Sequence, residues 1–110
     1  MAYQQQVTGA KAGTSFVLHG TTTKFDGIDA ARGVLLDAKG PGYERFIQTS
    51  SGKFYGFMEL HMTGEAKRQV AAAKGTPIEW VFADRNVMKV TEALFKREKI
   101  RGISLRYQKP

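Results

Sequence analysis

The sequence contains no cysteine, and it contains no apolar run close to the length of a membrane-spanning helix. Without thiols the chain forms no disulfide and no thiolate metal site, so its fold must depend on packing. The first residues, Met1-Ala2-Tyr3-Gln4, lack the basic start and the apolar segment of a secretory signal peptide. These absences argue against a disulfide scaffold and a membrane partner, and they suit a reducing cytoplasm.

Acidic residues are scarce relative to basic ones. The chain has 17 Lys and Arg against 10 Asp and Glu, which gives a formal net charge of +7. A small domain this basic favours a polyanionic partner, either nucleic acid or an acidic protein, although a basic surface can also serve solubility alone. The length of 110 residues suits one domain, so we expect a single domain over residues 1–110. A domain cut from a longer protein would have the same composition.

The first half of the chain alternates short apolar segments with turns. Residues 3–7 suggest a stub of helix, which Thr8-Gly9 ends. Three strand candidates follow, and a tight turn over residues 30–33 joins the second to the third. The three predicted strands cover residues 15–19, 23–29 and 33–39.

The second half predicts helix, strand, helix and strand. Apolar residues recur at helical spacing from Phe54 to Ala73, and Gly75-Thr76-Pro77 ends that helix. Residues 78–83 are mostly apolar, as in a buried central strand. Asp84 or Asn86 can cap a helix that Gly102 ends, before a last strand over residues 103–107. We therefore expect an α/β fold, in which a three-stranded meander and two crossover units form a mixed sheet.

The turn at residues 30–33 fixes which residues face one another. Centred on Ala31-Arg32, it pairs Asp29 with Val34 and Asp26 with Asp37. Because strand side chains alternate, Asp26, Asp37 and Lys39 would project from one face of the sheet and Asp29 from the other.

Two carboxylates that face each other destabilise a sheet unless something neutralises them. A divalent cation does so, and Asp26, Asp37 and the Ala38 carbonyl would offer it oxygen ligands. Lys39 could then orient or activate a water, which makes a site for metal-assisted phosphodiester hydrolysis. The plainer interpretation is an ordinary Asp-Lys pair at a strand end, and a register slip would substitute Asp29 for Asp26.

The segments "KFDGID" and "GVLLDAKGPGY" resemble the PD-(D/E)xK signature of restriction-endonuclease-like nucleases. Their wording is similar to that of the fifth restriction-endonuclease-fold toxin family of bacterial polymorphic toxins. The likeness extends over nearly the whole chain, from "YQQQVTG" to "IRGISL". Asp26 matches the first acid of the motif, Asp37 the D/E position and Lys39 the lysine. Asp37 departs from the more frequent Glu by one methylene.

The resemblance implies a restriction-endonuclease-like core and a metal-dependent DNase toxin that uses Mg²⁺ or Mn²⁺. It also implies the C-terminal domain of a larger effector, often of type VI secretion, delivered into the cytoplasm of a competing bacterium. A dedicated immunity protein would protect the producer, and the charge of +7 leads us to expect a net-acidic one. The alternatives are an RNase on the same fold and a non-catalytic nucleic-acid-binding module.

Several further residues are candidates for binding or support. Gly40 and Gly42 would let a phosphate backbone approach, and Tyr43 could contact a sugar or base. Lys67 and Arg68 could meet phosphates, or they could be a solvated helix face. His19 could assist a water or decorate the surface, and we expect His61 to face solvent. The possible auxiliary residues are Gln4, Gln5, Gln6, Asp29 and Gln69.

Overall fold

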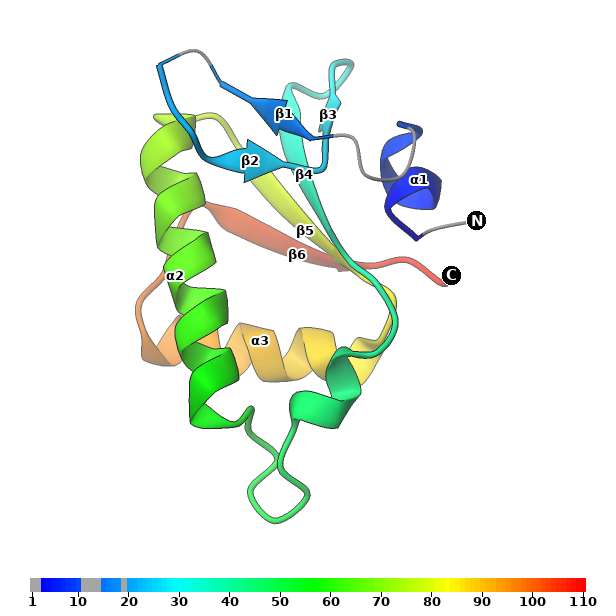
Figure 1. Cartoon of the computed structure of the whole chain (residues 1–110), viewed down its shortest axis with the longest axis vertical. Helices are drawn as coiled ribbons and strands as arrows, with labels where there is room; N and C mark the ends of the chain where they lie inside the picture. Colours follow the sequence, from blue (N-terminus) through cyan, green and yellow to red (C-terminus); the bar gives the residue numbers. More distant parts are fainter. Residues whose placement is uncertain (1–2, 11–14, 19) are drawn as a thin grey trace.

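The computed structural model describes residues 3–10, 15–18 and 20–110, so His19 lies outside the described residues. Two short helices, two long helices and six strands follow one another along this part of the chain (Figure 1). In chain order they are α1 (Tyr3–Thr8), β1 (Phe16–Val17), β2 (Lys24–Phe25), β3 (Gly27–Asp29), β4 (Val34–Lys39), the 3₁₀ helix η1 (Tyr43–Phe46), α2 (Gly56–Ala73), β5 (Ile78–Phe82), α3 (Arg85–Arg97) and β6 (Ile103–Tyr107).

The main sheet has four strands in the order β3-β4-β5-β6. Strand β3 runs antiparallel to β4, whereas β4, β5 and β6 are parallel to one another. The helices α2 and α3 form the connections that parallel neighbours require. The prediction of an α/β fold with a mixed sheet is confirmed.

The β3–β4 hairpin has the register that the turn predicts. Asp29 pairs with Val34 and Ile28 with Leu35. Gly33 closes the turn with a φ of 66°, a conformation that glycine adopts without strain. The side chains of β3 and β4 therefore alternate between the two faces of the sheet as expected.

The second predicted strand is broken at Asp26. Lys24 and Phe25 form β2, which pairs with β1 in a separate two-stranded sheet, while β3 pairs with β4. Asp26 lies between β2 and β3. Its backbone N–H still donates to Leu36 O at 2.9 Å, and its side chain accepts a hydrogen bond from the backbone N–H of Ala38 in β4. The predicted meander is thus two hairpins joined by one kinked residue.

The two faces of the main sheet bury different layers. Leu35 and Trp80 belong to the larger core, which α2 and α3 cover, whereas Leu36 and Val81 pack with Tyr3 of α1. Figure 1 shows α1 on one side of the sheet and α2 and α3 on the other. The face of each β4 residue therefore decides which helix it meets.

The helices bury the predicted faces. Met58, Met62, Ala66 and Ala73 of α2 are buried, as their spacing predicts. In α3, the Asp84 carboxylate caps the helix by accepting from Asn86 N at 2.8 Å and from Val87 N at 3.0 Å.

The expected end of the last helix at Gly102 is wrong, because α3 ends at Arg97. Lys99 has a φ of 55°, so the chain turns away from the helix axis three residues before Gly102. No helix in the described ranges is both long and apolar enough to cross a bilayer.

Candidate active site

Strand β4 places an acid and a base inside the protein. Asp37 and Lys39 are each 4% exposed, although charged side chains are almost never buried unless they are paired. Alternation along β4 puts both on the face of Leu35, which α2 covers, and β5 sets Trp80 and Phe82 beside them. The C-terminal end of β4 therefore carries a buried charged site.

Asp26 reaches the same end of β4 from the neighbouring edge. Its Oδ2 accepts a hydrogen bond from Ala38 N at 2.7 Å. Burial and the repulsion of Asp37 raise the pKa of the Asp26 carboxyl to about 6. Asp37 is thus close enough to Asp26 to disfavour the charge on Asp26, as the predicted pairing requires.

Lys39 joins the acids through its ammonium group. Its Nζ lies 2.6 Å from Asp37 Oδ2 and 2.5 Å from Glu65 Oε1. The same atom lies 4.3 Å from the centroid of the Trp80 ring and 5.9 Å from that of Tyr43. Burial opposes the charge, but Asp37 and then Glu65 outweigh it and raise the pKa of Lys39. The ammonium is therefore protonated and held by two carboxylates and an aromatic face.

Glu65 and Trp80 are site residues that the sequence did not identify. Glu65 lies on α2, one turn before Gln69, and it pairs with Lys39 across the two layers. Trp80 is fully buried, as predicted for a core residue, but it also lies under the lysine. Only the helical spacing of Glu65 and Gln69 could have linked Glu65 to this face.

Gln69 meets the site through Trp80. Its Oε1 accepts from Trp80 Nε1 at 2.7 Å in the interior. Because an indole N–H can only donate, the amide oxygen must face it. The amino group of Gln69 then has no hydrogen-bond partner among the described residues.

The acids are chemically suited to a divalent cation. A residue in a strand points its N–H and C=O to the same side, so the Ala38 carbonyl faces the edge from which Asp26 approaches. Asp37 Oδ2 is ion-paired with Lys39 but accepts no well-aligned hydrogen bond within the described segments. Within those segments no group of three or more His, Cys, Asp or Glu side chains is arranged so that it could hold a metal ion by side chains alone. The available ligands, two carboxylates and one carbonyl, suit a hard cation that keeps several waters.

Asp29 lies away from this site. Arg32 donates to its carboxylate at 2.6 Å, and these hydrogen bonds lower the pKa of Asp29. Arg32 and Arg106 also hold Glu79 on the opposite face of the sheet, at 3.0 and 3.1 Å. The structure thus brings Asp26 to Asp37 and leaves Asp29 in a separate ion-pair network.

The other candidates divide between the two sides of the molecule. Gln4, Gln5 and Gln6 belong to α1, which packs on the face opposite Asp37, and Gln6 donates to Lys109 O. Lys67 and Arg68 are adjacent in α2 but line different cavities. Lys67 lines a cavity with Lys99 and Arg101, whereas Arg68 lines cavities beside Thr22 and Thr23.

The segment after Lys39 stays next to the site. Gly42 has a φ of 109° and is the N-cap of η1, and Tyr43 follows with its half-buried ring near Lys39 Nζ. A side chain at Gly40 would lie 3.4 Å from Tyr3 Cβ. The role of Gly40, Gly42 and Tyr43 in binding a phosphate backbone stays a prediction. His61 is exposed on α2.

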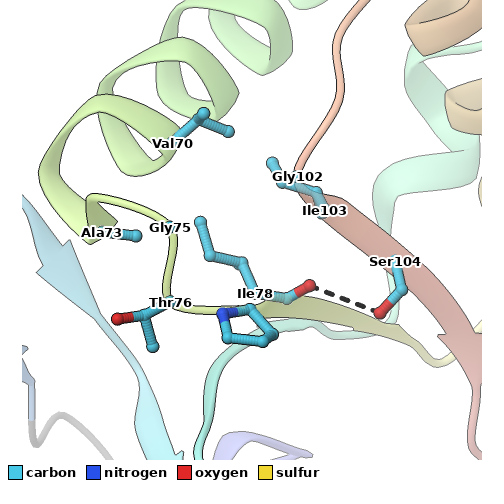
Figure 2. Close-up of a pocket in the computed structure, with 9 residues that line it drawn as sticks. Val70, Ala73, Gly75, Thr76, Ile78, Gly102, Ile103 and Ser104 are labelled. Carbon is cyan, nitrogen blue, oxygen red and sulfur yellow. Dashed lines mark hydrogen bonds between the residues drawn. The ribbon is translucent and has the colours of Figure 1, made fainter.

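An apolar cavity of about 450 Å³ lies at the other end of the sheet. Figure 2 shows Ile78 and Ser104 in its wall, where the Ser104 hydroxyl donates to Ile78 O at 3.3 Å. Ile78 neighbours Leu35 at the start of β5, whereas Lys39 neighbours Phe82 at its end. The part of the chain that the structure describes contributes no ionisable side chain to its lining, so those residues offer no group for acid–base chemistry there.

The model of one protein family, described as restriction endonuclease fold toxin 5, matches residues 1–85. The matched span runs from α1 through β5 and includes Asp26, Asp37, Lys39 and Glu65. A comparison with curated proteins finds no match.

Proposed function

The chain belongs to the restriction endonuclease fold toxin 5 family, and we propose that it is a metal-dependent endonuclease that cleaves DNA. The family description indicates a nuclease toxin. The observation that carries the finer proposal is the convergence of Asp26, Asp37 and Lys39 at one end of β4. Neighbouring carboxylates that repel each other away from solvent are typical of sites that bind cations.

The proposed roles follow from the contacts. Asp26, Asp37 and the Ala38 carbonyl would hold Mg²⁺ or Mn²⁺, and the bound cation would polarise the phosphoryl oxygen and lower the pKa of water. Lys39, protonated and fixed beside Asp37, would bind an oxygen of the scissile phosphate and stabilise the charge that develops there. The residues therefore supply both the cation site and a fixed positive charge.

Glu65 is a positioning residue in this proposal. Its carboxylate lies on the more open side of Lys39, with a quarter of the side chain exposed. Together with Asp37 and the Trp80 ring it limits the positions that the ammonium can take. We expect Glu65→Gln to keep a hydrogen bond to Lys39 and lower kcat more than it changes KM.

The test compares substrates side by side. Purified protein is incubated with plasmid DNA and with structured RNA, each with Mg²⁺ and with a chelator. The proposal predicts Mg²⁺-dependent loss of intact plasmid. Cleavage of RNA alone would favour the RNase, and salt-sensitive binding with no turnover in any metal would favour the non-catalytic module.

We also propose that residues 1–110 form a toxin domain from the C-terminal part of a larger effector, delivered into a competitor's cytoplasm. A nuclease with this activity must be restrained in the producing cell. The charge of +7 suits a net-acidic immunity protein that covers the site or its basic rim. Co-expression tests this: the toxin alone should kill, the product of the neighbouring gene should protect, and salt should weaken the complex.

A further inference from the structure

A groove runs beside the site, between the segment that enters β2 and helix α2. Two cavities, of about 350 and 540 Å³, form it and share Thr22, Thr23 and Arg68 as lining. The smaller cavity also contacts Glu65, whose carboxylate bonds Lys39 Nζ. The groove therefore begins next to the lysine and leads away from it.

Hydrogen-bond donors and positive charge dominate the smaller cavity. Lys24 and Arg68 bring two cationic side chains, and both residues are exposed to solvent. Thr22 and Thr23 bring hydroxyl groups. Among the described residues that line this cavity Glu65 is the one acid, and its carboxylate is ion-paired with Lys39. The lining suits an anion that carries several acceptor oxygens.

Gln69 adds an independent sign of a missing acceptor. It lines the same cavity, and its buried amino group has no partner among the described residues. The hydrogen bond from Trp80 fixes the amide orientation, so this donor cannot be removed by exchanging the oxygen and nitrogen. A buried donor without an acceptor is unfavourable, and an oxyanion entering the groove would supply one.

We propose that this groove binds the backbone phosphate next to the scissile phosphodiester, with Arg68, Lys24 and Thr22 as the principal contacts. The proposal rests on the proposed nuclease function and assigns the path of the substrate strand away from Lys39. Among the described residues that line the smaller cavity there is no aromatic ring on which a base could stack. The groove therefore reads the backbone, and the contact is independent of base sequence.

The first experiment measures the salt dependence of binding to a fluorescent DNA duplex in chelator, where no cleavage occurs. Arg68→Ala should weaken binding roughly tenfold and reduce the salt slope by about 1, as for one lost phosphate contact. Thr22→Val should weaken binding without changing the slope. The matched control is Lys89→Ala, which removes one positive charge from an exposed helical position outside both cavities.

The second experiment locates the phosphate. After the cleavage position has been mapped, two duplexes are prepared. Each carries one neutral methylphosphonate linkage, one on each side of the cleavage position. At one of the two positions the neutral linkage should weaken wild-type binding but leave Arg68→Ala binding unchanged, because the two changes remove the same contact.

The outcomes separate the two proposals. Absence of cleavage by the wild type would remove the nuclease function itself. Normal cleavage combined with equal effects of Arg68→Ala and Lys89→Ala would overturn the groove alone, as would additive effects of Arg68→Ala and the methylphosphonate at both positions. Correct folding of each variant is checked by thermal unfolding, and Arg68 and Thr22 lie outside the buried core, so their substitution leaves it intact.

Discussion

Replacing Asp26 with Asn should make the metal-free protein more stable while it abolishes cleavage. The amide keeps an oxygen that can accept the hydrogen bond from Ala38 N. It also removes the repulsion between Asp26 and Asp37, and with it one ligand for the cation. A site that gains stability when it loses function has been arranged for binding a cation rather than for the fold.

The size of the effect follows from the pKa of Asp26. Burial, followed by the charge of Asp37, raises it from 3.8 to about 6. This difference corresponds to about 3 kcal/mol, and partial exposure of the carboxylate reduces the expected gain to about 1–2 kcal/mol. The folded protein keeps the Asp26 proton between these two pH values, whereas the unfolded chain releases it. The wild type therefore loses stability as pH rises through this window and stays less stable above it, while the amide of the Asp26→Asn variant does not titrate.

Urea denaturation in chelator at about pH 4 and about pH 7 measures the difference. The gain should be near zero at the lower pH and complete at the higher one. Asp29→Asn is the control, because Asp29 is held by Arg32 on the other face and should show no gain. Adding Mg²⁺ should raise the wild-type midpoint and leave that of Asp26→Asn unchanged. A variant that is less stable at neutral pH, or a gain that does not depend on pH, would refute the reasoning.

Three further predictions concern the scaffold. Asp84→Ala should lower stability by about 1 kcal/mol, because the cap of α3 is lost, and should leave cleavage unchanged. Glu79→Gln should lower stability at neutral pH. Burial raises the pKa of Glu79, but hydrogen bonds from Arg32 and Arg106 outweigh it and lower the pKa, so the wild type's advantage should vanish as acid protonates Glu79. Met62→Ala should cost about 2–5 kcal/mol, since a fully buried side chain leaves a cavity. Urea denaturation checks each value, and an unchanged midpoint would contradict it.

The register of the central hairpin could be predicted from the sequence because local signals determine it. A turn ending in Gly33 and the alternation of β4 leave one pairing that buries Leu35 and Leu36 on their proper faces. That pairing brings Asp26 to Asp37, and the periodic apolar spacing of α2 likewise predicts its buried face. These features depend on neighbours within one turn or one hairpin.

Contacts between layers could not be predicted in the same way. Glu65 meets Lys39 because of the position along β4 at which α2 crosses it, and the apolar periodicity of α2 does not determine that position. The position of Trp80 under the lysine depends on the parallel register of β5 against β4, which no turn between them sets. The break at Asp26 could not be predicted because it arises from a side-chain contact and not from a sequence signal. The Asp26 carboxylate, in place of a backbone carbonyl, accepts the hydrogen bond from Ala38 N.

The measurement that tests the central claim most directly is the initial rate of plasmid cleavage as a function of Mg²⁺ concentration, for the wild type and for Asp37→Asn. Asp37 is buried against Lys39, and Asn preserves its shape, so both proteins can be compared in the folded state. The proposal predicts a rate that rises with Mg²⁺ and saturates for the wild type, and a rate lower by roughly 100-fold or more for Asp37→Asn at every concentration. Equal rates for two folded proteins, or wild-type cleavage that persists in chelator, would contradict it.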